Sequence, residues 1–376
     1  MRNIYFVFYN ILRNLISMIF GIFSVKNNRI LFSSTKGKAY SCNPKTISEF
    51  LQSNGKIDYE IIWINKGMRK TPPNVKLVNY RSLRYIYYYF TAKWIITNNG
   101  FKNEFKKPIG QYRLETWHGG GAYKKINNNH TNFQKYRCSL TGNEIDYFIS
   151  SCKKFSDVMS NAEYVDRKKF LEIGMPRNDI FFDVEKVKMA KLKVMEILKL
   201  KDCKIVLYAP TWRDNGSTQE ITDICKTIKL INQQTEQNFC LLCRAHHRGK
   251  IQGFEEDIFD VTDYPDMQEL LCAADVLITD YSSCMWDFSL MYKPCFIYAT
   301  DIEYYEQERN FYTPMSEWPF PIARNSNELV HNIVCFDNEK YIKDVKKHHN
   351  SLGICEDGHA CEKICKIIEE KCCGDL

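Results

Sequence analysis

The sequence predicts an α/β protein of two doubly wound domains, and three observations support this prediction. The chain of 376 residues is longer than one ordinary hydrophobic core, and suits two domains of roughly 150 to 180 residues each. Short apolar runs alternate with amphipathic stretches, which is typical of parallel strands joined by helices. A lysine-rich helical stretch at 184–201 separates the two halves.

The composition is that of a globular protein with an anionic partner. Hydrophobic residues make up 44% and charged residues 26% of the chain, which argues against a disordered chain or a polytopic membrane protein. The net charge of +7 is spread along the chain without a basic block. It therefore favours phosphorylated substrates or anionic lipid head groups, and we expect no nucleic-acid partner.

The sixteen cysteines are irregularly spaced and no cleavable signal peptide is evident, so the sequence favours a reducing cytosol. Cys240 and Cys243 form the one close pair, within an apolar run that reads as a strand. Side chains three apart on a strand point to opposite faces, which argues against shared zinc ligation. Four further cysteines fall on one predicted helix: Cys361, Cys365, Cys372 and Cys373. We expect no metal site.

The first segment, 1–27, is expected to be an amphipathic helix that attaches the protein to a membrane. Its apolar stretch is about as long as a bilayer requires. Its polar residues recur at steps of three, four or seven and form one stripe of a helix, beside Arg13: Asn3, Asn10, Asn14, Ser17, Gly21 and Ser24. The apolar face would enter the membrane interface while the stripe faces water or protein. A membrane-spanning helix and a helix packed on the domain are the alternatives.

The first domain, 28–185, is expected to alternate strands and helices, and to carry the acceptor and the base. Strands are predicted at 29–35, 58–65, 93–100, 114–120 and 170–174, with YFISSC as a further apolar run. A helix that begins near Pro44 separates the first two strands.

The second domain, 186–376, is expected to bind the donor. Its predicted strands are 204–210, FCLLCRAH and DIFDVTDY, followed by a βαβ unit at 276–298 and a closing helix at 360–372. In two doubly wound domains, a ligand binds in the cleft between them, at the carboxyl ends of the strands.

The βαβ unit carries the clearest indication of function. Ser282 and Ser283 stand where a strand ends and a helix begins. Backbone N–H groups, the positive end of the helix dipole and two hydroxyls would therefore converge on a phosphate. The alternative is that Ser282 is simply an N-cap.

Other strand ends carry residues suited to the same chemistry. In WHGGG, 117–121, three glycines allow close backbone approach to a phosphate, and His118 is placed for a general base. A glycine-rich turn with a structural histidine is the alternative. Cationic or hydroxyl side chains follow three more strands: Arg244 and His246, Thr211 and Arg213, and Arg177 with Asn178. Together these residues predict a phosphate-binding cleft.

These motifs resemble the CDP-glycerol glycerophosphotransferases of teichoic acid and capsule synthesis. The resemblance covers most of the chain and rests on FSSTKGKAYSCNP, ETWHGGGAYKKI, GMPRND, VLYAPTWRD, LLCRAH, LITDYSS through RNFY, and DGHACEKI. It implies a GT-B-like fold of two Rossmann-like domains and peripheral attachment to the cytoplasmic face of the cell membrane. It also implies transfer of glycerol phosphate from CDP-glycerol to a hydroxyl of a polyprenyl-linked or saccharide acceptor, with release of CMP. No cofactor other than the donor is expected.

The resemblance also assigns roles to individual residues. His118 resembles the family's proposed general base, and His246 its partner near the donor diphosphate. The residues that resemble donor-phosphate binders are Arg244, Ser282, Ser283, Gly119, Thr211, Arg213 and Arg309. Asp280 and Glu308 are expected to be structural.

The chain also departs from the family pattern around the expected cleft. Gly120 and Gly121 replace a small polar residue and a proline, and His247 stands where proline is commoner. Asn310 replaces a glycine. These departures leave other readings open: transfer of ribitol phosphate from CDP-ribitol, a GT-B nucleotide-sugar glycosyltransferase, or an idle membrane-bound scaffold. The length of the chain slightly favours a single addition over polymerisation.

Overall fold

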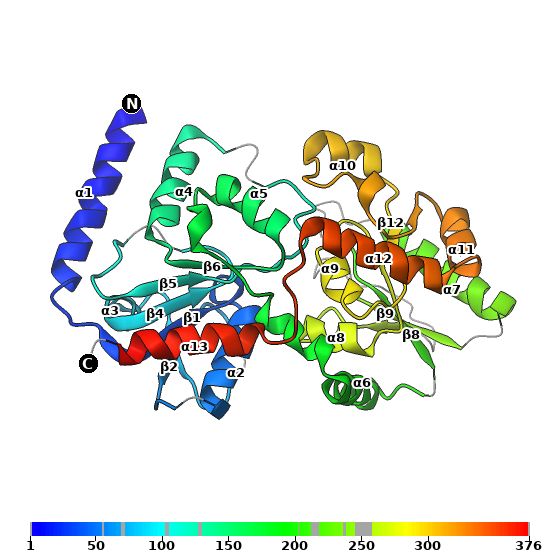
Figure 1. Cartoon of the computed structure of the whole chain (residues 1–376), viewed down its shortest axis with the longest axis horizontal. Coiled ribbons are helices and arrows are strands. Elements are labelled where there is room, and N and C mark those ends of the chain that lie inside the picture. The colour runs from blue at the N-terminus through cyan, green and yellow to red at the C-terminus, as the bar shows by residue number, and fades with distance from the viewer. Residues whose placement is uncertain are drawn as a thin grey trace. The chain divides into compact units, whose positions relative to one another are not determined.

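The computed structural model describes residues 2–54, 56–68, 72–101, 105–126, 130–201, 203–211, 218–235, 238–244 and 258–374. The chain forms two compact units, each built on its own sheet (Figure 1). Unit 1 comprises Met1–His118, Asn127–Asp179 and Cys355–Leu376. Unit 2 comprises Gly119–Ile126 and Ile180–Ile354.

Unit 1 contains a seven-stranded parallel sheet in the order β3-β2-β1-β4-β5-β6-β7. Its strands are β1 Lys26–Ser33, β2 Glu60–Asn65, β3 Lys76–Asn79, β4 Ala92–Thr97, β5 Tyr112–Glu115, β6 Tyr147–Ser150 and β7 Phe170–Glu172. Every residue of β4 is buried, as expected for a central strand of a parallel sheet that is covered on both faces. Because all strands are parallel, their carboxyl ends share one edge of the sheet.

The helices of unit 1 are α1 Arg2–Phe20, α2 Cys42–Asn54, α3 Leu83–Thr91, α4 Asn132–Glu144, α5 Lys153–Glu163 and α13 Ala360–Cys373. Pro44 stands in the first turn of α2, where a missing backbone N–H costs no helical hydrogen bond. The last helix of the chain, α13, packs beside α2 and β1 (Figure 1).

Unit 2 contains a six-stranded parallel sheet in the order β10-β9-β8-β11-β12-β13. Its strands are β8 Lys204–Tyr208, β9 Phe239–Cys243, β10 Ile258–Asp260, β11 Val276–Thr279, β12 Cys295–Tyr298 and β13 Ile322–Ala323. Its helices are α6 Val184–Leu198, α7 Thr218–Thr235, α8 Met267–Ala273, α9 Cys284–Ser289, α10 Ile302–Glu308, α11 Ser326–Val334 and α12 Asn338–Leu352.

The expected α/β class with parallel sheets is confirmed, but the division of the chain differs from the expected 28–185 and 186–376. The closing helix α13 belongs to unit 1 and not to the second half. Conversely, Gly119–Ile126 belongs to unit 2. Both differences arise from contacts between segments that are far apart in sequence, which local periodicity does not report.

The cysteines also differ in part from the expectation. Cys240 forms a disulfide with Cys203, which the sequence did not predict. Cys243 instead lies in the core of unit 2 with a hydrogen bond to Cys225, so the close pair does point to opposite faces as expected. Within the described ranges, no group of His, Cys, Asp or Glu side chains could hold a metal ion.

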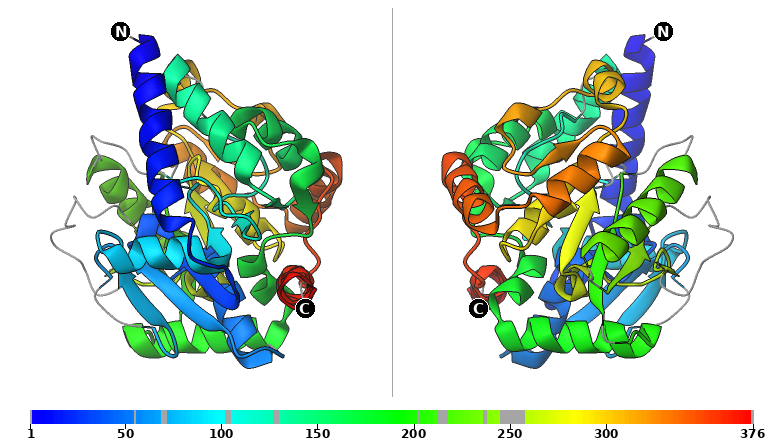
Figure 2. Two further views of the ribbon diagram at one scale, coloured as in Figure 1. Left: turned by 90° about the vertical axis from the view of Figure 1, so that its left-hand side faces the viewer. Right: turned by 90° about the vertical axis from the view of Figure 1, so that its right-hand side faces the viewer.

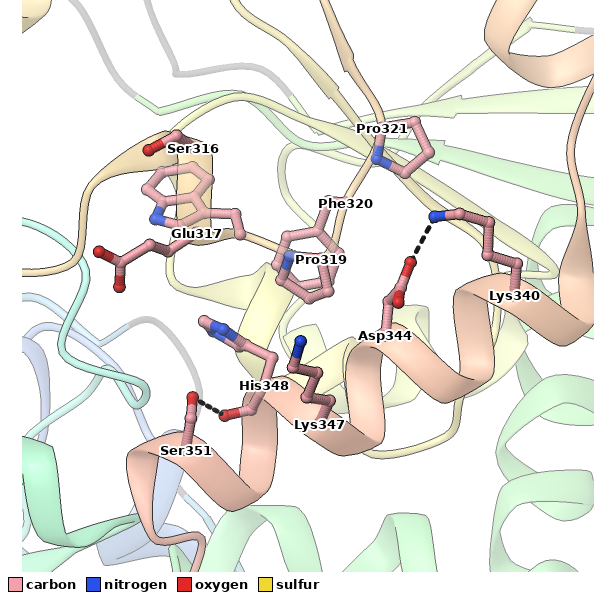
Figure 3. Close-up of a pocket in the computed structure, with 11 residues that line it drawn as sticks. Ser316, Glu317, Pro319, Phe320, Pro321, Lys340, Asp344, Lys347, His348 and Ser351 are labelled. Carbon is pink, nitrogen blue, oxygen red and sulfur yellow. Dashed lines mark hydrogen bonds and ion pairs between the residues drawn. The ribbon is translucent and has the colours of Figure 1, made fainter.

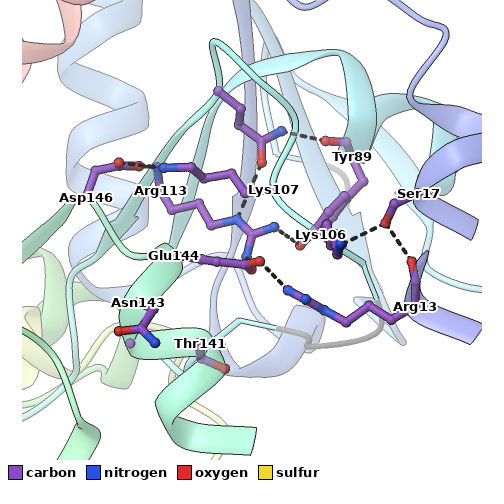
Figure 4. A network of polar contacts seen from close by, with 12 residues as sticks. Arg13, Ser17, Tyr89, Lys106, Lys107, Arg113, Thr141, Asn143, Glu144 and Asp146 are labelled. Atoms are coloured by element: carbon purple, nitrogen blue, oxygen red, sulfur yellow. Dashed lines mark hydrogen bonds and ion pairs between the residues drawn. The ribbon is translucent and has the colours of Figure 1, made fainter. Parts of the chain in front are cut away.

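Helix α1 has the predicted polar stripe, and the stripe faces protein (Figure 4). Asn10 Nδ2 donates to Tyr136 Oη at 2.6 Å, and Ser17 Oγ accepts from the Lys106 backbone N–H at 2.9 Å. Arg13 is 5% exposed and pairs with Glu144, whose other oxygen accepts from the buried Arg113. These contacts fix α1 on unit 1 by its polar side.

The other side of α1 is apolar and open to solvent. In Figure 2, left, α1 stands in front of the rest of unit 1 with no element covering it. Side chains that are about half or more exposed on this face and just after it are Val7, Phe8, Ile11, Leu12, Leu15, Met18, Ile19 and Ile22. Among the described residues, no helix meets the length and hydropathy needed to cross a bilayer.

Candidate active site

His118 lies at the carboxyl end of β5 and is exposed. Its Nδ1 is 2.8 Å from the backbone carbonyl oxygen of Asn98 and 3.5 Å from Asn99 Nδ2. A carbonyl oxygen can only accept a hydrogen bond, so Nδ1 carries the proton of the neutral ring. Nε2 is therefore the basic nitrogen, which suits a side chain that has to take a proton from a substrate hydroxyl.

Asn98, which receives the His118 hydrogen bond, is itself held rigidly. Its side chain is 1% exposed, accepts from the Thr35 backbone N–H at 3.0 Å and lies 3.2 Å from Ser34 Oγ. The FSST motif, which includes Ser34 and Thr35, therefore supports the loop that orients the histidine.

The residue before His118 has a strained backbone. Trp117 has φ of 52°, a left-handed conformation that bulky residues rarely adopt. The carboxylate of Glu115 accepts from the backbone N–H of Trp117 and of Gly100, both at 2.9 Å. One side chain thus ties together the loops after β4 and β5. Such strain is typical of positions where the backbone is fixed for function.

Glu115 is nearly inaccessible, with 1% of its surface exposed. Burial raises the pKa of its carboxyl well above the ordinary value, although the two backbone N–H donors act in the opposite direction. The sequence analysis did not select Glu115. A charged residue within an otherwise apolar strand was the signal that could have identified it.

In unit 2, the two glycines that depart from the family pattern accommodate Trp286 of α9. A Cβ on Gly120 would lie 2.3 Å from Trp286 Cδ1, and one on Gly121 would lie 2.7 Å from Trp286 Cε3. Gly121 also has φ of +73°. Close backbone approach was expected to serve a phosphate. At Gly120 and Gly121, the structure shows that it serves the packing of an indole ring.

Three predicted residues of unit 2 follow neighbouring strands. Thr211 comes after β8, Arg244 after β9 and Ser282 after β11, and the sheet order is β9-β8-β11. Adjacent strands are about 5 Å apart, so these strand ends lie close together at one edge of the sheet. Asp280, expected to be structural, is 2% exposed and accepts from the backbone N–H groups of Thr211 and Tyr281.

Arg244 is the strongest cationic candidate at this edge. Its backbone N–H donates to the Tyr208 carbonyl at 2.8 Å, while the buried Nη1 has no hydrogen-bond partner in the part of the chain that the structure describes. Burial lowers the pKa of its guanidinium. A bound anion would relieve both features.

The two serines do not cap the helix as an ordinary N-cap would. Ser283 is the N-cap of α9 and its hydroxyl caps no backbone N–H. Ser282 hydrogen-bonds the thiol of Cys284. The simple N-cap interpretation of Ser282 is therefore wrong.

The remaining predicted residues are placed as follows. Arg309 is exposed at the end of α10, and the neighbouring Asn310 has φ of 61°, so it keeps the left-handed backbone that a glycine would allow. His246 and Arg213 lie outside the described residues. Gly119 is buried.

Arg177 and Asn178 of GMPRND are buried at 6% and 0% exposure. The Arg177 backbone N–H donates to Asn43 Oδ1, and Asn178 Nδ2 donates to Glu356. These contacts are structural and lie within unit 1, so the motif does not contribute cationic groups to a phosphate site as expected.

Unit 2 also has a hollow of about 670 Å³ between α12 and 316–321 (Figure 3). His348 lines it, and its Nε2 is 3.0 Å from the Tyr123 hydroxyl. Burial lowers the pKa of His348 to about 4. None of the residues predicted from the sequence lines this hollow.

Comparisons with known proteins agree with the motifs. Residues 15–370 match the family described as CDP-glycerol:poly(glycerophosphate) glycerophosphotransferase. A teichoic acid poly(glycerol phosphate) polymerase of Bacillus spizizenii is 30% identical over 373 residues, covering 93% of this chain and 94% of the relative. A teichoic acid glycerol-phosphate transferase of Staphylococcus aureus is 32% identical over 366 residues, covering 91% and 92%.

A solved structure of the wall teichoic acid polymerase TagF, a histidine-to-asparagine variant soaked with CDPG, is also similar. It has a TM-score of 0.85 and 27% identity, and the match covers 100% of this chain and 96% of that chain. The chain belongs to the CDP-glycerol:poly(glycerophosphate) glycerophosphotransferase family.

Proposed function

We propose that the protein transfers glycerol phosphate from CDP-glycerol to a hydroxyl of a lipid-linked or saccharide acceptor in teichoic acid synthesis, releasing CMP. Family membership and the names of the relatives support this reaction. The structural observation that carries it is His118, whose Nδ1 hydrogen bond to Asn98 makes Nε2 the basic nitrogen at a strand end.

In the proposed mechanism, His118 Nε2 removes the proton from the acceptor hydroxyl as its oxygen attacks the glycerol-bearing phosphorus of the donor. The new P–O bond forms while the bond to the CMP oxygen breaks. A positioned base of this kind contributes roughly 10²- to 10⁴-fold to the rate.

Negative charge then grows on the departing CMP phosphate. Arg244 and the hydroxyls of Ser282 and Ser283 are the donors that we assign to it, with Thr211 beside them. Fixed donors aimed at developing charge stabilise a transition state without reorganisation. His246, Gly119, Arg213 and Arg309 complete the set by resemblance to the family. The proposal invokes no cofactor besides the donor.

Glycerol is the polyol that we assign to the donor, because the two relatives described above both act on glycerol phosphate by name. Relatives named for ribitol phosphate also match, at 29% identity or less. The length of the chain does not decide between one addition and many. A relative matched over 94% of its own length is called a polymerase.

We further propose that the protein lies on the cytoplasmic face of the cell membrane through α1. The support is the exposed apolar face of this helix, including Phe8 at 66% and Met18 at 68% exposure. The opposite face is fixed to unit 1 through Arg13 and Glu144. An exposed apolar face of this size is typical of a helix that lies in the membrane interface.

The test is CMP release by the purified full chain with liposomes and a lipid-linked acceptor analogue. CDP-glycerol, CDP-ribitol and a UDP-sugar are offered separately. We expect acceptor-dependent CMP from CDP-glycerol alone. Turnover of CDP-ribitol alone would assign a ribitol donor, and turnover of only the UDP-sugar would contradict the reaction class.

His118→Ala provides the internal control for mechanism. Because His118 is exposed, its removal should leave folding intact while CMP release falls at least about 100-fold. His359→Ala, which replaces another exposed histidine, should retain activity. Full activity of His118→Ala would refute its role as base.

A further inference from the structure

A second hollow lies in unit 1, at the carboxyl ends of β2 and β3. Its volume is about 530 Å³, and it is lined by Asn65, Lys66, Gly67, Met68, Asn79, Tyr80 and Arg81. Because the seven strands are parallel, this hollow lies at the same edge of the sheet as His118. In doubly wound sheets, ligands bind at this edge.

The lining of this hollow is cationic. Lys66 Nζ lies 4.7 Å from the centroid of the Tyr80 ring, and the Arg81 guanidinium carbon lies 5.4 Å from it. None of the lining residues is acidic. Within the described ranges, neither Lys66 nor Arg81 forms an ion pair with a carboxylate. Two cations gathered around one ring without a counter-charge create a positive potential that attracts an anion.

The backbone that carries these cations is fixed. Asn65 Oδ1 accepts from the backbone N–H groups of Gly67 and Met68, both at 2.8 Å. Asn79 Oδ1 accepts from the Arg81 N–H at 2.9 Å. Arg81 Nε also donates to the Tyr80 hydroxyl at 2.9 Å, which orients the guanidinium. Little further order has to be imposed when an anion binds.

We propose that this hollow binds a phosphate group of the acceptor. The arginine fork and the lysine point charge are the side chains best suited to a phosphate ester, and the tyrosine ring offers a flat surface to an attached sugar or polyol. This inference rests on the proposed function, because it names the part of the acceptor that is held away from the reacting hydroxyl.

The strand order sets the distance between the two ends of such an acceptor. From β5, which carries His118, the sheet continues through β4 and β1 to β2 and β3. Strands are about 4.8 Å apart, so the hollow is roughly 14 to 19 Å along the sheet edge from His118. This separation leaves room for a short saccharide, or a few polyol phosphate units, between the anchored phosphate and the hydroxyl.

The experiment compares two soluble acceptors that share one saccharide, one on a short-chain prenyl diphosphate and one on a neutral alkyl group. The test variant is Lys66→Ala with Arg81→Ala, and Lys154→Ala removes an exposed lysine of α5 in the same unit. In the double variant, we expect KM for the diphosphate acceptor to rise about 10- to 100-fold. KM for CDP-glycerol, the neutral acceptor and kcat should not change.

An equal effect on both acceptors, or none, would overturn the proposal. Direct binding of the diphosphate acceptor, measured by calorimetry without donor, separates it from the proposed function. If the wild type binds this acceptor and the double variant does not, but neither releases CMP from CDP-glycerol, the site stands and the reaction fails.

An anionic lipid head group carries the same phosphate chemistry, so a third arm uses vesicles of phosphatidylglycerol or phosphatidylcholine. We expect the double variant to sediment with both as the wild type does. Loss of binding to phosphatidylglycerol vesicles with an unchanged KM for the soluble diphosphate acceptor would assign the hollow to the membrane and overturn the acceptor site.

Discussion

The carboxylate of Asp179 accepts a hydrogen bond of 2.7 Å from the backbone N–H of Cys361, 182 residues later in the chain. Its other oxygen accepts from Ala360 at 3.0 Å. These are the first two residues of α13, whose own N-cap, His359, makes no side-chain capping bond. The GMPRND loop therefore caps a helix from the far end of the sequence, which explains why α13 belongs to unit 1.

Asp179→Ala should lower the free energy of unfolding by about 1 kcal/mol, because it removes the acceptor for two N–H groups at a helix start. Urea denaturation at pH 6 measures this. Asp58→Ala, at an exposed position whose side chain caps no helix, should change the stability by less than about 0.5 kcal/mol. Equal effects of the two substitutions would contradict the capping role.

The same carboxyl predicts a pH dependence. Burial raises the pKa of Asp179 from 3.8 to about 6, although its backbone hydrogen bonds act in the opposite direction. A carboxyl whose pKa is raised on folding contributes stability that is fully present below its unfolded pKa and is lost as the pH rises through its folded pKa. The stability difference between wild type and Asp179→Ala should therefore be larger at pH 4 than at pH 7.5. A difference that grows with pH would show that this assignment is wrong.

The sequence predicted those elements that are long or locally periodic. The unit β11–α9–β12 was found because apolar runs flank a turn of hydroxyl residues. Strand β3 was missed because four residues, KLVN, carry too little pattern. Helix α13 was found, but its unit was not, because the contact with Asp179 spans half the chain.

The candidate site shows the same division. His118 was selected because histidine at a strand end has an evident chemical use. Glu115 and Asn98 act only by holding backbone in place, which residue type and spacing do not reveal. The packing of Gly120 against Trp286 joins two motifs that the sequence analysis treated separately.

Glu115→Gln should impair catalysis with little effect on substrate binding. The amide keeps the size of the carboxylate but accepts through one oxygen only, so either Trp117 or Gly100 loses its partner. An unsatisfied buried donor costs about 1–3 kcal/mol, and displacement of His118 should lower kcat about 10- to 100-fold.

Steady-state kinetics of CMP release test this, with KM for CDP-glycerol expected to stay within about twofold because Glu115 acts on positioning alone. Glu362→Gln, an exposed site on α13, is the matched substitution and should behave as wild type. If Glu115→Gln keeps the wild-type kcat, the clamp has no role in orienting the histidine.

Gly120→Ala should lower the free energy of unfolding by about 1–3 kcal/mol, because the new methyl would overlap the Trp286 indole. The backbone of Gly120 is not left-handed, so the cost is steric. In a Trp286→Ala background, the same substitution should cost much less, and chemical denaturation of the four proteins gives the coupling directly. Additive effects would show that the two positions do not contact.

Leu12→Asp with Leu15→Asp should abolish membrane attachment while leaving the fold intact. Both leucines are nearly half exposed, at 48% and 47%, on the face of α1 opposite its polar contacts. Charges on this face would have to enter the acyl boundary, so liposome binding should fall at least about tenfold. Val184→Asp, at an apolar side chain that is 79% exposed on α6, should bind as wild type. Sedimentation with liposomes decides between the two outcomes. Undiminished binding of the α1 variant would mean that another surface holds the protein at the membrane.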